Sequence, residues 1–140
     1  MKRLSVMCAA LLLSALIASS QQGLTLQVQL RYTGSGTVDA THKIFVALWD
    51  SPNTEGGPPV AVQSATSKNG TVTFSDVQKA PAYVTAAYDP SGHWDAQSAP
   101  PTGASLGVYS KAPPKPDPIA IAPGKPARVT ITFDDKVRVP

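Results

Sequence analysis

The sequence predicts an all-β fold, a seven-stranded Greek-key sandwich that follows an N-terminal signal peptide. Two observations predict the sandwich. Short apolar or alternating segments recur between turn residues, and after residue 20 no window shows apolar residues at helical spacing with capping residues around it. Seven short strands at such spacing are typical of a sandwich, and a closed barrel is the all-β alternative.

The first 20 residues have the layout of a secretory signal peptide. Lys2 and Arg3 supply the positive start, residues 4–17 are mostly apolar, and small residues precede a cut after Ser20. The apolar run is shorter than the roughly 20 residues of a membrane-spanning helix, so a permanent anchor is the weaker alternative. We therefore expect residues 21–140 to be one exported domain, periplasmic or extracellular, without a membrane span.

The composition of this expected domain excludes several classes of protein. The single cysteine, Cys8, lies in the leader, so the domain has no disulfide and depends on its core for stability. Of the 12 basic residues two lie in the leader, which leaves ten against nine acidic residues. The basic residues are scattered and form no patch with aromatic residues, so no nucleic-acid partner is expected. We expect a monomer.

Seven segments are predicted as strands. Residues 24–32 alternate apolar and polar side chains, which is the pattern of a half-buried strand. Residues 44–49 are apolar throughout, which predicts a central strand covered on both faces. Asn69 and Gly70 predict a tight hairpin turn. The other predicted strands are residues 60–66, 71–74, 83–88, 119–121 and 128–133.

A long proline-rich loop is predicted at residues 89–118, with seven prolines in 30 residues. Connections of this length in compact domains are usually functional or disordered. We expect the loop to fold over one edge or mouth of the sandwich. Its aromatic residues Trp94 and Tyr109 have two interpretations. They are either a stacking platform for a sugar or peptide, or plugs that pin the loop to the sandwich.

A candidate metal site lies at the start of this loop. Asp89, Ser91 and Asp95 occupy alternate positions, with His93 between them, and calcium loops place oxygen ligands at such spacing. The alternative is that Asp89 and Ser91 make turn hydrogen bonds after the preceding strand. We therefore expect no cofactor, and calcium is the alternative that the pattern suggests.

Catalytic motifs are missing from the sequence. After the leader there is no cysteine, only two histidines (His42 and His93), one glutamate (Glu55) and no Gly-x-Ser-x-Gly motif. A small hydrolase would need His93 to meet a serine and a carboxylate. We therefore predict that the protein is not an enzyme.

Two passages resemble known families. Residues 69–77 (Asn-Gly-Thr-Val-Thr-Phe-Ser-Asp-Val), followed by Pro-Ala-Tyr-Val at 81–84, resemble the carboxypeptidase regulatory-like, prealbumin-like sandwich domain. Residues 88–95 and 101–110 resemble an uncharacterised family of small secreted bacterial proteins of the same apparent, immunoglobulin-like fold. The resemblance implies an exported accessory domain and no enzyme.

Together these observations predict a non-catalytic exported β-sandwich module with a structural or protein-interaction role. Its expected partner is a protein or polysaccharide at the cell envelope. The alternative is a carbohydrate-binding module that uses Trp94 and Tyr109. A calcium-binding domain and a small hydrolase are weaker alternatives.

Overall fold

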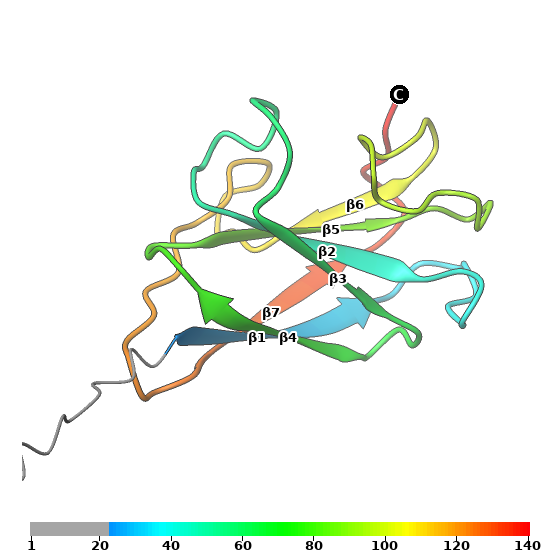
Figure 1. The fold of residues 1–140 in the computed structure, drawn as a ribbon. Helices are drawn as coiled ribbons and strands as arrows, with labels where there is room; N and C mark the ends of the chain where they lie inside the picture. The colour runs from blue at the N-terminus through cyan, green and yellow to red at the C-terminus, as the bar shows by residue number, and fades with distance from the viewer. Residues whose placement is uncertain (1–22) are drawn as a thin grey trace, which may run out of the picture.

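The computed structural model describes residues 23–140 as two packed β-sheets (Figure 1). The predicted signal peptide lies outside the described residues. The strands of the described part are β1 (Leu24–Tyr32), β2 (Ile44–Trp49), β3 (Ala61–Ala65), β4 (Thr71–Val77), β5 (Tyr83–Tyr88), β6 (Ser105–Val108) and β7 (Ala127–Phe133).

The strands form a three-stranded sheet of order β4-β1-β7 and a four-stranded sheet of order β3-β2-β5-β6. All neighbours in these sheets are antiparallel except β1 and β7, which are parallel. The two sheets are the two layers seen in Figure 1, and they make an open sandwich rather than the closed alternative. The prediction of an all-β sandwich is therefore confirmed; the structure has seven strands, six of which are at predicted positions.

The core lies between the inner faces of the two sheets. Leu26, Val28 and Leu30 alternate along β1 and are fully buried, and Ile44 and Val46 of β2 are fully buried in the opposite sheet. Burial of one such side chain contributes about 1.5–3 kcal/mol. The period of two in the sequence therefore sets both the strand and its inner face.

The prediction that β2 would be covered on both faces is wrong. Its burial alternates: Ile44 and Leu48 are buried, whereas Phe45 and Trp49 are half-buried on the other face. The two-layer architecture covers only one face of each sheet, and the described residues supply no third layer. Burial in the core therefore does not explain the apolar side chains on the outer face of β2.

The predicted strand at residues 119–121 is not formed. Ile119 makes a single bridge with Ala82, and no ladder extends from it. Pro118 and Pro123 flank the segment and have no N–H to donate, which prevents a longer ladder. Ile119 and Ile121 are nevertheless buried in the core, so the apolar pattern was correct for burial and wrong for strand pairing.

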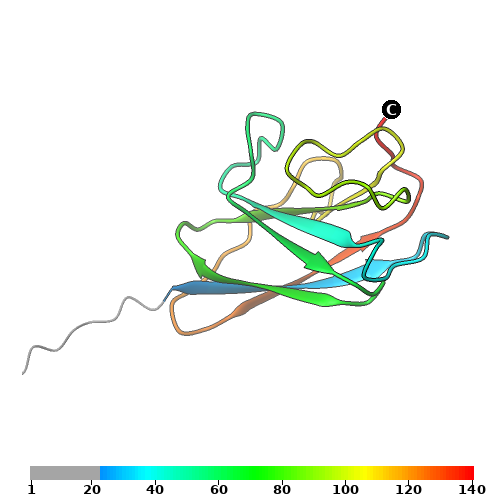
Figure 2. The same cartoon turned by 45° about the vertical axis from the view of Figure 1, so that its right-hand side comes forward.

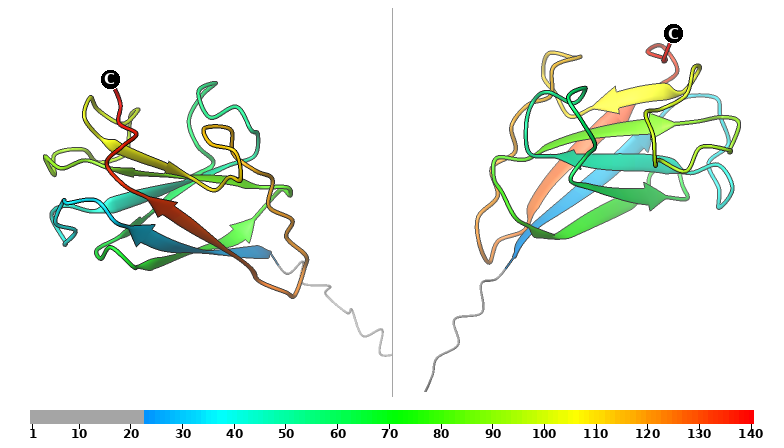
Figure 3. Two further views of the ribbon diagram at one scale, coloured as in Figure 1. Left: turned by 180° about the vertical axis from the view of Figure 1, so that it is seen from behind. Right: turned by 45° about the horizontal axis from the view of Figure 1, so that its top comes forward.

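The predicted loop at residues 89–118 is interrupted by β6, which pairs with β5 at the edge of the four-stranded sheet. The continuous loop was therefore wrong: residues 89–104 and 109–118 are separate loops at opposite ends of the sheet (Figures 2 and 3). The strand has only four residues and prolines lie on both sides of it, which is why its pattern was weak.

The carboxylate of Asp135 joins the two sheets just after β7. It accepts hydrogen bonds from the Tyr32 hydroxyl of β1 (2.5 Å), the Ser105 hydroxyl of β6 (2.8 Å) and the Ser35 backbone N–H (2.9 Å). The hydrogen bond from Tyr32 is the main reason that the pKa of Asp135 lies well below its usual range. Burial, with Asp135 beside it, raises the pKa of Tyr32 to about 12.

The Asp135 carboxylate also contacts the C-terminal tail, through an ion pair with the Arg138 guanidinium (3.5 Å). Beyond the bend at Asp135 the chain pairs with the segment before and within β6, because the N–H of Leu106 donates to Val137 O (2.9 Å) and that of Gly103 to Val139 O (2.8 Å). Residues 137–139 thus extend the four-stranded sheet at its β6 edge. The tail crosses from one layer to the other at the Asp135 carboxylate.

We expect the variant Asp135→Asn to lose about 1–3 kcal/mol of unfolding free energy at pH 7, because hydrogen bonds to a charged acceptor are lost. A carboxyl with a lowered folded pKa stabilises the protein above its unfolded pKa, and this contribution is lost as the pH falls. The difference between wild type and variant, measured by urea unfolding, should therefore shrink between about pH 5 and pH 2. Asp134→Asn, next to it on the surface, is the control. An equal difference at both pH values would contradict the assignment.

Candidate functional site

The outer faces of the two sheets have opposite chemistry. The strand registers place polar side chains on the outer face of the three-stranded sheet: Gln27, Gln29, Arg31, Thr71, Thr73, Arg128, Thr130 and Thr132. The outer face of the four-stranded sheet, called the apolar face below, consists of Phe45, Ala47, Trp49, Val62, Ser64, Tyr83, Thr85, Ala87, Leu106 and Val108. None of the side chains of the apolar face is charged.

The apolar face is not needed to fold the sandwich. An antiparallel sheet needs one buried face, and its other face is normally polar and in contact with water. The three-stranded sheet follows this rule and the four-stranded sheet does not. Contiguous apolar surface on a folded domain marks sites of interaction more often than chance. The apolar face is therefore the candidate functional surface.

Aromatic side chains lie at both ends of the apolar face. At one end Trp49 and Tyr83 are neighbours in the β2–β5 register, and the indole N–H of Trp49 donates to the Thr85 hydroxyl (3.0 Å). At the other end the rings of Phe45 and Trp94 meet edge to face, with centroids 5.0 Å apart and planes at 75°. The 89–104 loop thus brings one of its aromatic residues onto this face.

Asp89 holds the loop that carries Trp94. Its side chain is buried (6 % exposed) and accepts hydrogen bonds from the Ser91 N–H (3.0 Å), the Ser91 hydroxyl (2.6 Å) and the Trp94 N–H (3.2 Å). Burial raises the pKa of Asp89, but the hydrogen bonds from Ser91 and Trp94 outweigh it and hold the pKa below its usual value. The indole N–H of Trp94 donates to Ser98 O (3.1 Å), which fixes the ring.

Two of the three predicted metal ligands, Asp89 and Ser91, lie together in this loop and hydrogen-bond to each other, and Asp95 lines the same hollow as Asp89. Both oxygens of Asp89 accept hydrogen bonds from Ser91 or Trp94, as the turn alternative predicts, and Asp95 instead accepts from the Gln97 N–H (3.0 Å). Within residues 23–140 no three His, Cys, Asp or Glu side chains lie close enough together to hold a metal ion. The geometry of Asp89, Ser91 and Asp95 is that of a hydrogen-bonded turn.

Trp94 and Tyr109 do not share a surface. Tyr109 follows β6, where its N–H donates to Val84 O (3.2 Å), and the β5–β6 register turns its side chain toward the inner face. It is half-buried and packs against the core, whereas Trp94 lies on the opposite, outer face against Phe45. Tyr109 therefore packs against the core, whereas Trp94 packs against Phe45, so the two rings do not form one stacking platform.

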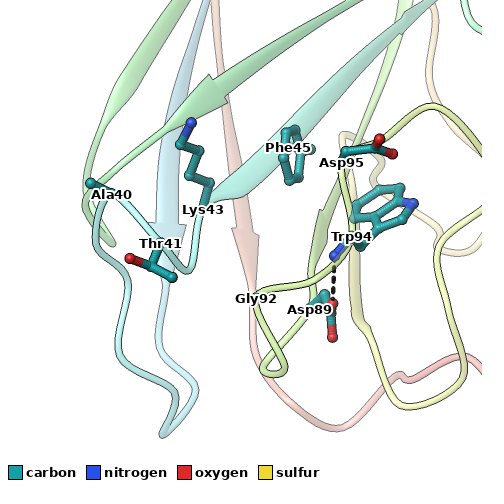
Figure 4. Close-up of a pocket in the computed structure, with 8 residues that line it drawn as sticks. All are labelled: Ala40, Thr41, Lys43, Phe45, Asp89, Gly92, Trp94 and Asp95. Carbon is teal, nitrogen blue, oxygen red and sulfur yellow. Dashed lines mark hydrogen bonds between the residues drawn. The ribbon is translucent and has the colours of Figure 1, made fainter.

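A hollow of about 260 Å³ lies beside Trp94 (Figure 4). Its aromatic wall is formed by Phe45 and Trp94, and the side chains of Lys43 and Asp95 lie on either side of Phe45. The remaining lining residues are Ala40, Thr41, Asp89 and Gly92. The hollow combines ring surface with one cation, Lys43, and two carboxylates, Asp89 and Asp95.

The polar groups of the hollow are free to contact a ligand. In the part of the chain that the structure describes, the Lys43 ammonium has no ion-pair or hydrogen-bond partner. One oxygen of the Asp95 carboxylate accepts the Gln97 N–H and the other oxygen has no partner within the same residues. The sequence did not single out Lys43 or Phe45. The continuous apolar run at 44–49 was the signal for Phe45.

Histidine and acidic side chains meet at one place near the hollow. His42 Nδ1 lies 2.9 Å from Asp39 Oδ1, but among the described residues neither His42 nor His93 has a hydrogen bond from its ring to a serine hydroxyl. His93 is exposed, and its backbone N–H donates to the Ser91 hydroxyl (3.3 Å). The arrangement suits loop packing, since Gly92 lies directly against the His42 ring.

Comparison with known proteins does not assign a family. No family model, curated protein or solved structure matches the chain. Within residues 23–140 there is no helix long and apolar enough to cross a membrane. The apolar face and the hollow beside Trp94 are therefore the features that bear on function.

We expect Asp89→Ala to free the Trp94 loop and to lower the unfolding free energy by about 1–3 kcal/mol, because the N–H groups of Ser91 and Trp94 lose their acceptor. In a Trp49→Phe background the emission of Trp94 should shift to longer wavelength as its ring leaves Phe45. Asp50→Ala, at an exposed position of another loop, is the control. An unchanged emission maximum would show that Asp89 does not position the ring.

Proposed function

We propose that the protein is a non-catalytic, exported β-sandwich module that binds a partner at the cell envelope through the apolar face. The observation that supports this most strongly is the contrast between the two outer faces of one sandwich. A polar outer face is sufficient for folding, as the three-stranded sheet shows, so the uncharged aromatic and aliphatic surface of the other sheet is available for recognition.

The architecture of the apolar face also favours binding over structural packing within the chain. Its residues lie on regular strands, which hold side chains more precisely than loops do. Loops rise beyond the face at its two ends, residues 50–60 and 109–118 beside Trp49 and residues 89–104 beside Phe45 (Figures 1 and 3). A rigid floor with projecting loops is a common form of a binding surface.

We further propose that the sandwich is of the Greek-key, immunoglobulin-like or prealbumin-like type. The passage that resembles the carboxypeptidase regulatory-like domain supports this, because it forms the turn before β4, β4 itself and the start of β5. The turn is closed by the Gly70 N–H, which donates to Ser67 O (3.2 Å). Such domains are accessory modules, which agrees with a binding role.

We expect Val62→Lys to reduce the amount of protein that cosediments with a bacterial envelope fraction by about ten-fold, because a charge on the apolar face must be desolvated on contact. Val62 lies on β3, an edge strand, so the lysine can reach water in the free protein and stability should change by about 0.5 kcal/mol or less. Pelleting and quantitative immunoblotting measure the bound fraction.

The matched control is Thr73→Lys. Thr73 is exposed on β4, the edge strand of the other sheet, and its pairing with Gln27 places it on the polar outer face. This variant adds the same charge and should cosediment like the wild type. Equal loss in both variants would point to a charge effect, and no loss in either would exclude the apolar face as the contact surface.

Export itself predicts a defined N-terminus. The full chain expressed in a bacterial host should be recovered outside the cytoplasm, beginning at Gln21, and mass spectrometry should find the tryptic peptide 21–31. Leu12→Arg breaks the apolar run of the leader and should leave the protein inside the cell with its leader attached. Recovery of wild type with Met1 and Lys2 in place would contradict the proposed signal peptide.

A further inference from the structure

We propose that the hollow between Lys43, Phe45, Trp94 and Asp95 binds one residue of a neutral sugar chain that lies along the apolar face. The inference rests on the proposed function and adds to it the chemical class of the ligand. A sugar ring offers an apolar C–H surface to an aromatic ring and hydroxyl groups at its rim. The hollow supplies partners for both (Figure 4).

The aromatic wall is preorganised. The Trp94 backbone N–H donates to the buried Asp89, its indole N–H donates to Ser98 O, and the ring meets Phe45 edge to face. Together these three contacts hold the Trp94 residue and its ring without a ligand. A ring that is already fixed loses little side-chain entropy on binding, which favours affinity.

The two charged groups match the hydroxyl groups of a sugar. Lys43 donates hydrogen bonds and the free Asp95 oxygen accepts them, and a hydroxyl group can both accept and donate. A second carboxylate, Asp89, also lines the hollow, so its three charged side chains sum to −1 and do not attract an acidic ligand. This charge, together with the uncharged apolar face, favours a neutral ligand over an acidic one.

A peptide chain fits the surface less well. Extended peptides are typically held by main-chain hydrogen bonds to an open sheet edge. Phe45 lies on β2, which is paired with β3 on one side and β5 on the other, so its backbone groups are already used. A ligand on this face is left with ring surfaces and side-chain polar groups, which are the contacts that sugars use.

The size and surroundings of the hollow agree with a single ring of a longer chain. A volume of about 260 Å³ lies just below the range of about 300–1,000 Å³ that holds a drug-sized ligand. A second aromatic pair, Trp49 and Tyr83, lies at the far end of the face, four residues along β2 or about 13 Å at the rise of a strand. A sugar chain that lies along the apolar face can thus contact aromatic rings at both ends of the face.

The experiment is a titration of the purified protein with soluble hexasaccharides, read by calorimetry. The neutral probes are cello-, chito-, manno- and laminari-hexaose, and oligogalacturonate is the acidic probe. We expect saturable binding of at least one neutral probe and none of the acidic one. Trp94→Ala should weaken this binding about ten-fold or more, since a ring that stacks on the sugar is removed.

Lys43→Met is the second variant, because Trp94→Ala removes a packed side chain and can loosen the loop. Methionine keeps the apolar stem of Lys43 and removes its donor, so binding should weaken about three-fold to ten-fold without loss of stability. Gln97→Ala, on the same loop but outside the hollow, is the control and should bind like the wild type.

Several outcomes would overturn the inference. Binding of no neutral probe, equal binding of oligogalacturonate, or neutral binding that survives both Trp94→Ala and Lys43→Met would each exclude this sugar subsite. The envelope experiment with Val62→Lys and Thr73→Lys is independent of these titrations. If Val62→Lys still abolishes cosedimentation while no sugar binds, the proposed function stands and only the sugar assignment fails.

Discussion

The packing of the two sheets through their inner faces is the constraint on which the rest of the structure depends. The chain has no disulfide to use in this domain, so the buried side chains between the layers must supply its stability. Only every second residue of each strand faces the other sheet. The residues between them point outward and do not contribute to the core. The two outer faces can therefore differ: one is polar, and the other is aromatic and aliphatic. The two-layer packing leaves both outer faces uncovered and does not itself explain why one of them is apolar.

Two carboxylates, Asp135 and Asp89, connect the two sheets to their loops by accepting several hydrogen bonds each. Both accept hydrogen bonds from hydroxyl and backbone N–H groups, and in both the hydrogen bonds lower the pKa despite burial. A charged acceptor strengthens such bonds, so one side chain can order several segments. Asp135 contacts the tail that extends the sheet beside β6, and Asp89 fixes the loop that places Trp94. The framework and the candidate site are thus held by equivalent contacts at different positions.

The sequence predicted what depends on local pattern and failed where distant residues decide. The alternation of residues 24–32 predicted β1 and its inner face. The tight hairpin predicted at Asn69 and Gly70 is wrong, because β3 and β4 on either side of this turn belong to different sheets and do not pair. The pattern at 119–121 predicted burial but not pairing, because the flanking prolines remove donors. The contact of Trp94 with Phe45 depends on the register of β2 with β5 and on the path of the 89–104 loop. Neither can be predicted from a local pattern in a single sequence. The four residues of β6 were hidden by the prolines around them.

The surroundings of the apolar face bear on which partner it can admit. An exposed apolar surface attracts a second copy of the same chain as readily as a ligand. Here the loops at both ends project beyond the face, so a second sandwich of equal width would meet the loops before it met the floor (Figure 3). A slender chain can lie between them and reach the strands. The projecting loops therefore favour an extended ligand over a flat protein surface, which agrees with the proposed sugar chain.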